Sequence, residues 1–173
     1  MAYNAATGAQ RWLSRYNGRA NSNDFANTVV VAPGGHAVYV TGGSRGKTSH
    51  IDFATVAYNA ATGALRWVSR YNGPGNFDDF GRSLAVTPNG HTMVVTGPSW
   101  GVASNTDYAT IAYNTATGAQ LWVSRYNGPG NSSDGARALV VSPSGDKVYV
   151  TGFSDATVGT NTSGDYATIA YKA

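Results

Sequence analysis

The chain has 173 residues, a net charge of +3 and no cysteine, which excludes disulfide bonds and thiolate metal sites. All nine acidic residues are aspartate and lysine is scarce, while Val, Thr, Tyr and Gly abound, so we expect an all-β protein with almost no helix. The arginines are dispersed, no run approaches the roughly 20 apolar residues of a membrane helix, and no signal peptide is visible. We therefore expect no nucleic-acid and no membrane partner.

One unit of sequence is written three times along the chain. Residues 2–8 (AYNAATG) return at 57–63 and, with one substitution, at 112–118, which gives a period of 55 residues. Such a period is typical of repeat proteins, in which one unit cannot bury its apolar face alone and neighbouring units share a core. We predict three tandem repeats, at about 2–56, 57–111 and 112–173.

Each repeat contains four strand-like runs separated by turn residues. The clearest copy has strands at 120–127, 137–142, 147–152 and 165–171. Pro-x-Gly turns at 33–36, 88–91 and 143–146 join the first two strands of each set, and an Asn-x-Ala-Thr-Gly turn joins the third to the fourth. Four antiparallel strands at a fixed spacing predict one blade of a β-propeller. His36 and His91 fall at hairpin tips, so we expect them to face solvent.

A tryptophan also recurs with the same period, and it carries a resemblance to a known family. The pattern Ala2-x-Asn4-x-x-Thr7-Gly8-x-x-x-Trp12 resembles the tryptophan-docking motif of quinoprotein dehydrogenase propellers, whose repeats are pyrroloquinoline-quinone-like. In that family the indole lies between adjacent blades and locks them together. The resemblance implies this docking role for Trp12, Trp67, Trp122, Thr7, Gly8, Thr62, Gly63, Thr117 and Gly118.

The resemblance implies the fold rather than the chemistry. Asn stands where the family has Asp, and Ala9, Ala64 and Ala119 stand where Lys is usual. The family's enzymes hold a quinone over the channel with an acidic metal site and an Asp base, and no residues here match them. We expect a non-catalytic protein with no cofactor and no metal. Related propellers are often bacterial and secreted or periplasmic, but the chain itself leaves its location unknown.

Three blades are too few to close a ring, because propellers have about 4–8 blades and an open arc exposes two strand edges. The chain opens with an outer strand at 11–17 that lacks a blade, and it ends on a third strand at 165–172 that lacks an outer strand. Two chains joined head to tail, with domain-swapped closure of both split blades, would form a six-bladed ring. We predict a self-assembling homodimer.

Each set of polar residues that recurs in every repeat allows a structural and a functional interpretation. Asp24, Asp79 and Asp134 precede the first strands, and Asp52, Asp107 and Asp165 open the third strands; one or two carboxylates per loop favour turn hydrogen bonds over a cation site. The invariant Arg-Tyr-Asn-Gly at 15–18, 70–73 and 125–128 fits packing at blade edges. A ring of equivalent sugar or acidic-ligand sites is the alternative.

The loop between the second and third strands is where the repeats diverge, at 43–50, 98–106 and 155–164. Trp100 is the only tryptophan off the period, which makes it the best aromatic candidate for contact with a ligand or partner. The other candidates are Arg45, Lys47, His50 and Asp155. Relaxed drift of the loops is the competing explanation.

The sequence thus predicts a non-catalytic propeller scaffold or binding module that assembles from identical chains. The alternative is a multivalent, lectin-like propeller with carbohydrate or another small ligand bound at blade junctions or variable loops. Quinone dehydrogenase activity is not expected, since the residues for it are missing.

Overall fold

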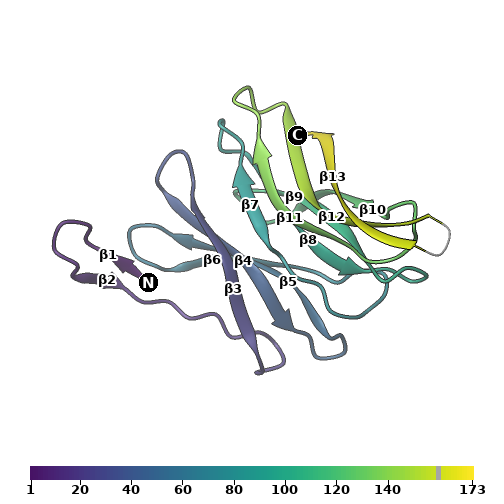
Figure 1. The fold of residues 1–173 in the computed structure, drawn as a ribbon. Coiled ribbons are helices and arrows are strands. Elements are labelled where there is room, and N and C mark those ends of the chain that lie inside the picture. Colours follow the sequence, from purple (N-terminus) through teal and green to yellow (C-terminus); the bar gives the residue numbers. More distant parts are fainter. Residues whose placement is uncertain (159–160) are drawn as a thin grey trace.

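The computed structural model describes residues 1–158 and 161–173. Within these residues every regular element is a β-strand and every strand pair is antiparallel, which confirms the all-β prediction. Four sheets follow one another from the N-terminal hairpin at the left of Figure 1 to the C-terminal sheet at the right. The hairpin consists of β1 (Ala2–Tyr3) and β2 (Gln10–Trp12).

Two sheets are four-stranded meanders, and we call them blade 1 and blade 2. Blade 1 contains β3 (Asp24–Val31), β4 (Ala37–Arg45), β5 (Ile51–Asn59) and β6 (Leu65–Tyr71). Blade 2 contains β7 (Ser83–Val86), β8 (Thr92–Trp100), β9 (Thr106–Asn114) and β10 (Gln120–Tyr126). In both sheets the strands pair in chain order, as the repeat predicts.

The last sheet, blade 3, has three strands among the described residues. These are β11 (Asp134–Val141), β12 (Lys147–Val158) and β13 (Asn161–Lys172), and they also pair in chain order. Blade 3 therefore has the counterparts of the first three strands of blades 1 and 2. The counterpart of β6 and β10 is not present in it.

The turn residues act as predicted. Gly35, Gly90 and Gly145 have φ values of 70°, 76° and 77°, a region that glycine enters without a steric penalty. In the β5–β6 turn, Asn59 Oδ1 accepts the backbone N–H groups of Ala61 at 2.9 Å and Thr62 at 3.1 Å. His36 and His91 are exposed at their hairpins.

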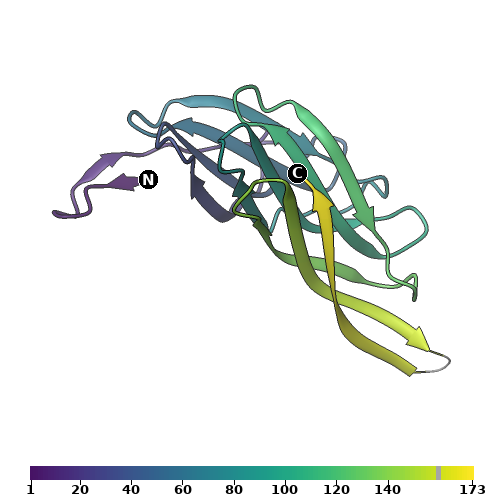
Figure 2. The ribbon, with the colours of Figure 1, turned by 90° about the horizontal axis from the view of Figure 1, so that it is seen from above.

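Several predicted boundaries were wrong. β4 extends to Arg45 and β8 to Trp100, so the variable loops are shorter than expected. Residues 155–158 and 161–164 of the predicted third loop extend the β12–β13 hairpin, in which Asp155 pairs with Gly164, because Thr and Val favour extended backbone. The rest of that loop, 159–160, lies outside the described residues. Figure 2 shows this hairpin projecting beyond the other blades. The outer strand at 11–17 is reduced to β2, since only Ala2–Tyr3 lie beside it.

The apolar core lies between neighbouring blades rather than within one sheet. Tyr39 and Phe53 of blade 1 pack against Met93, Val95 and Ile111 of blade 2 in one cluster. A second cluster joins blade 2 to blade 3, through residues that include Val94, Tyr108, Val148 and Val150. Each blade thus has one face for the blade before it and another for the blade after it. No helix in the described part of the chain is long and apolar enough to cross a membrane.

Candidate functional site

The periodic tryptophans of the first two repeats contact the next blade. Trp12 Nε1 donates to Ala60 O at 3.0 Å, and Trp67 Nε1 donates to Thr115 O at 2.9 Å. The serine two residues later adds a second bond: Ser14 Oγ donates to Gly63 O and Ser69 Oγ to Gly118 O. Each outer strand is therefore tied to the turn between the last two strands of the following blade.

Glycine is required in those turns for two reasons. Gly63 and Gly118 each have a φ of 73°, and a Cβ on either would lie 2.7 Å from the indole of Trp12 or Trp67. Thr62 and Thr117 fix the same turns, because their Oγ1 atoms accept the N–H of Ala64 and Ala119 at 3.2 Å. Thr7 and Gly8 form the same turn in the N-terminal hairpin, where a Cβ on Gly8 would meet nothing within 4 Å.

The third tryptophan also contacts the following blade, but it lacks the hydrogen bond of the other two. Trp122 of blade 2 lies beside Tyr171 of blade 3, with ring centroids 6.0 Å apart, and its Nε1 donates no hydrogen bond within the described residues. Trp122 and the Thr7-Gly8 turn are thus the two halves of a contact that blades 1 and 2 make within the chain. They lie at opposite ends of the molecule.

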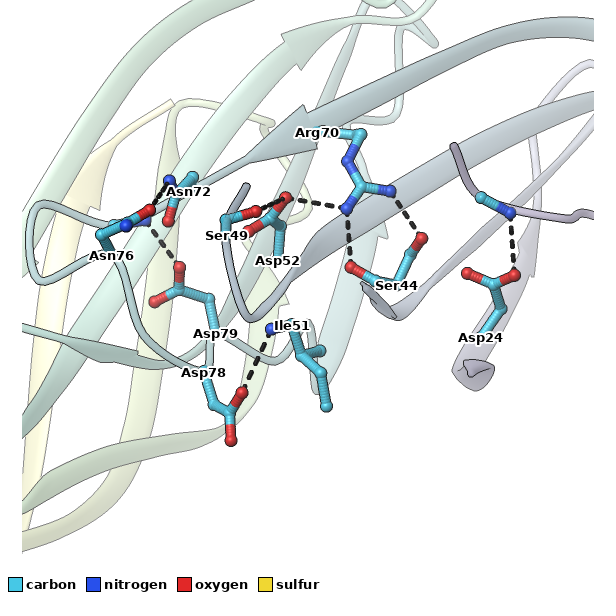
Figure 3. Close-up of polar contacts among 12 residues, drawn as sticks. Asp24, Ser44, Ser49, Ile51, Asp52, Arg70, Asn72, Asn76, Asp78 and Asp79 are labelled. Carbon is cyan, nitrogen blue, oxygen red and sulfur yellow. Dashed lines mark hydrogen bonds and ion pairs between the residues drawn. The ribbon is translucent and has the colours of Figure 1, made fainter. Parts of the chain in front are cut away.

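The repeated Arg-Tyr pair forms a polar network that links three strands and two repeats. Arg70 Nη2 donates to Asp52 Oδ2 at 2.7 Å and to Ser44 O at 2.6 Å (Figure 3). Its Nη1 donates to Tyr16 OH at 3.2 Å. Arg125 makes the same contacts with its counterparts Asp107, Ser99 and Tyr71. Since both guanidinium groups are bound by protein partners, these contacts support a packing role for the repeated Arg-Tyr-Asn-Gly segments over a ring of ligand sites.

The third copy of this network is divided between the two ends of the chain. Ser154, Asp165 and Tyr126 occupy the places of Ser44, Asp52 and Tyr16, but the chain has no arginine at the corresponding place. Tyr126 OH instead lies 3.4 Å from Ser154 Oγ, and the Asp165 side chain is exposed. At the other end, Arg15 is exposed on the segment after β2.

We predict that Arg70→Ala lowers the free energy of unfolding by about 3 kcal/mol, because Asp52 would stay 5% exposed without its cation. The matched control is Arg66→Ala, which removes the same side chain from an exposed position of β6 with no ion pair among the described residues and should change stability by less than about 0.5 kcal/mol. Urea denaturation of dilute protein measures both. Equal losses for the two variants would contradict the role given to Arg70.

The aspartates before the first strands close turns. Their Oδ2 atoms accept backbone N–H groups: Asp24 from Gly18 at 2.8 Å, Asp79 from Gly73 and Asp134 from Gly128 at 2.6 Å. Burial raises the pKa of Asp79, although the hydrogen bond from Gly73 opposes this shift. Asp52 and Asp107 are instead the ion-pair partners of arginine, a role that the sequence analysis did not assign. Among the described residues, no group of three or more His, Cys, Asp or Glu side chains is placed to hold a metal ion.

The candidate binding residues lie at one end of the blades but are not all together. Arg45, Trp100 and Asp155 occupy equivalent positions, in β4, β8 and β12 respectively, while Lys47 is exposed in the β4–β5 loop. His50 and Trp100 lie on either side of Phe77, whose ring centroid is 4.9 Å from that of His50 and 5.5 Å from that of Trp100. Phe77 was missed in the sequence, although the Ser at the same place in the other repeats was a usable signal.

The two outer faces of the array expose apolar side chains that are buried in the interior copies. On blade 1, Val29 is 62% exposed, whereas its counterpart Leu84 is 4% exposed. On blade 3, Tyr166 is 85% exposed, whereas its counterpart Tyr108 is fully buried. A cavity of about 390 Å³ lies against the open face of blade 1, lined by residues that include Val29, Val38, Trp12 and Tyr16. Each open face thus matches one side of an interface that the chain already forms internally.

These features agree with the comparisons to known proteins. Successive antiparallel blades, tied by repeated outer-strand contacts, define a β-propeller built from PQQ-like repeats. The chain belongs to the family described as outer membrane protein assembly factor BamB, whose model matches residues 1–165. The match confirms the resemblance that the Ala-x-Asn-x-x-Thr-Gly pattern predicted.

Two solved structures are similar to the chain at low sequence identity. Kuenenia stuttgartiensis hydrazine synthase matches with a TM-score of 0.58 and 16% identity, over 82% of this chain and 38% of that one. Pseudomonas aeruginosa periplasmic gluconolactonase (PpgL) matches with a TM-score of 0.48 and 13% identity, over 86% of this chain and 41% of that one. The chain therefore spans less than half the length of either structure. No curated protein sequence matches it.

Proposed function

We propose that this protein is a non-catalytic propeller scaffold that assembles head to tail from identical chains and presents its loops for binding. The observation that carries the proposal is that both open faces are copies of interfaces buried inside the same chain. The face with Val29 corresponds to the face of blade 2 that covers blade 1, and the face with Tyr166 corresponds to the face of blade 1 that covers blade 2. A second copy of the chain supplies the missing side at each end.

The polar contacts support the same pairing. Arg15 of one copy would reach Asp165, Ser154 and Tyr126 of the other, as Arg70 reaches its own partners in blade 1. Trp122 of one copy would contact the Thr7-Gly8 turn of the other, where a Cβ on Gly8 would meet nothing within 4 Å. Two copies would give six blades, within the range of about 4–8 found in propellers.

The non-catalytic part of the proposal has separate support. The repeated Arg and Asp side chains form ion pairs and close turns, which favours a structural role for them. The family description names an assembly factor. The similar hydrazine synthase is an enzyme by its name, but at 16% identity it is a guide to the fold alone.

We expect light scattering after size-exclusion chromatography to give twice the mass of one chain. Closing the ring buries both apolar faces and removes the exposed strand edges, which is the physical reason for association. A stable and soluble monomer at micromolar concentration would overturn the proposed assembly. A trimer would replace the six-bladed ring by one of nine blades.

A further inference from the structure

Four residues that depart from the repeat gather at the junction of blades 1 and 2. They are His50 from the β4–β5 loop, Phe77 and Asp78 from the β6–β7 connection, and Trp100 from the end of β8. The junction of blades 2 and 3 has Asn105, Ser132, Ser133 and Asp155 at the same four places. Drift would place such changes independently of one another. Here three separate segments change together, and they change where they meet.

The four side chains form one continuous surface. The ring of Phe77 contacts both His50 and Trp100, at tilts of 32° and 44°. Asp78 Oδ1 accepts the N–H of Ile51 at 3.1 Å (Figure 3). The same oxygen lies 3.9 Å from His50 Nδ1. Within the described residues, its second oxygen, Oδ2, makes no hydrogen bond. The surface therefore combines three aromatic rings with a carboxylate oxygen that is available to a ligand.

Packing alone does not explain this surface. Phe77 is 51% exposed, and nearly half of the His50 side chain is exposed as well, so much of the aromatic area faces water. The junction of blades 2 and 3 is an internal comparison, because it forms with Asn105, Ser132 and Asp155 in place of the three rings. The fold thus tolerates polar residues at these positions, and the aromatic residues are not needed for docking one blade on the next.

We propose that His50, Phe77, Asp78 and Trp100 form a carbohydrate-binding site that takes a pyranoside. Aromatic rings offer flat apolar faces with a polar tip on Trp and His, which suits the C–H face of a sugar ring and its flanking hydroxyl groups. Asp78 Oδ2 accepts a hydroxyl hydrogen of the sugar, a charge-assisted bond stronger than a neutral one. The proposal rests on the binding role of the scaffold and not on its assembly, because all four residues belong to one chain.

The surroundings favour a sugar over an apolar partner. Asn72 Nδ2 donates to Asn76 Oδ1 at 2.7 Å in the connection that carries Phe77, and Ser49 Oγ donates to Asp52 Oδ2 at 2.9 Å in the β4–β5 loop that carries His50. Amide and hydroxyl groups around exposed rings provide the hydrogen-bonding neighbours that a polyol requires, and they are not the closed apolar core of a protein interface.

The test uses the full chain with the methyl α-pyranosides of glucose, mannose, galactose and N-acetylglucosamine, by saturation-transfer NMR and tryptophan fluorescence titration, and a glycan array. We expect saturable binding with one site per chain. Phe77→Ser, which restores the residue of the other repeats, should weaken affinity about tenfold or more. Asp78→Asn keeps the acceptor for the Ile51 N–H and should also weaken it about tenfold, because the charge is lost.

Leu121→Ala is the matched control, because Leu121 on the outer strand β10 is also 51% exposed and should leave affinity unchanged. Thermal unfolding and light scattering are run on every variant. The proposed site is overturned if the chain binds none of the glycosides or array glycans. It is also overturned if sugar binding survives Phe77→Ser, or if Phe77 is needed for a protein complex instead of for sugar binding. Loss of sugar binding in an intact dimer leaves the proposed assembly standing, and sugar binding by a monomer leaves the site standing.

Discussion

Replacing Trp67 by alanine is expected to lower the free energy of unfolding by about 3 kcal/mol, the low end of the range for such substitutions, since part of the indole is exposed. The loss combines the stacking of the ring on Tyr39 at 5.8 Å, its cover over Gly118 and its hydrogen bond to Thr115 O. The stacking on Tyr39 lies within blade 1, whereas the other two contacts join blade 1 to blade 2. Chemical denaturation of dilute protein measures the change.

Two comparisons make this result specific. Trp122→Ala in the dilute monomer should cost less than half as much, because its ring contacts blade 3 through Tyr171 but covers no Thr-Gly turn and donates no hydrogen bond within the described residues. Trp100→Ala should also cost less, since Trp100 lies in a partly exposed loop cluster. Trp67→Phe keeps an aromatic ring but loses the bond to Thr115 O, at a cost of about 1 kcal/mol, and it remains informative if the alanine variant does not fold. Similar losses at all three tryptophans would show that blade docking does not depend on Trp67.

Charge reversal at the proposed junction is expected to control assembly. Arg15→Asp places two carboxylates together at each contact between copies, and Asp165→Arg places two guanidinium groups together, so each variant alone should be monomeric. Like charges brought together at an interface cost several kcal/mol, which is enough to weaken association about a hundredfold or more. Light scattering at matched concentrations measures the loss.

Mixing the two variants should restore the assembly. In a ring of one Arg15→Asp chain and one Asp165→Arg chain, one junction carries the exchanged pair and the other carries the original Arg15 and Asp165. The complex should therefore form as a strict heterodimer. Arg66→Asp, at an exposed position of β6 that forms no ion pair among the described residues, controls for net charge. If the mixture stays monomeric while the unmodified chain dimerises, the junction is formed by other residues.

The repeat period predicted most of the fold because each local signal occurs three times. The Asn-x-Ala-Thr-Gly turns, the Pro-x-Gly hairpins and the strand order all follow from the period. Strand ends were less predictable. β12 and β13 pair with each other and so extend into a segment whose sequence is typical of a loop. The partial pairing of β2 has the same cause: an outer strand is only as long as the strand beside it.

The candidate site was only partly predictable. Trp100 and His50 stood out because they break the repeat, but Phe77 lies 27 residues after His50 and belongs to another connection. Their proximity depends on how two blades meet, which no local pattern encodes. The Arg70–Asp52 pair was missed for a similar reason. Its two members repeat faithfully, and an invariant residue gives no indication of its partner across the sheet.

The match between the two open faces has a consequence for the size of the assembly. A contact between copies that repeats the contact between blades is directional, with unlike surfaces meeting, and such contacts close into rings or continue as helical filaments according to geometry alone. The residues at the seam therefore determine whether copies join, but not how many. Copy number depends on the rotation from one blade to the next, so a substitution that alters the packing of Tyr39 against blade 2 would change the ring without touching its seam.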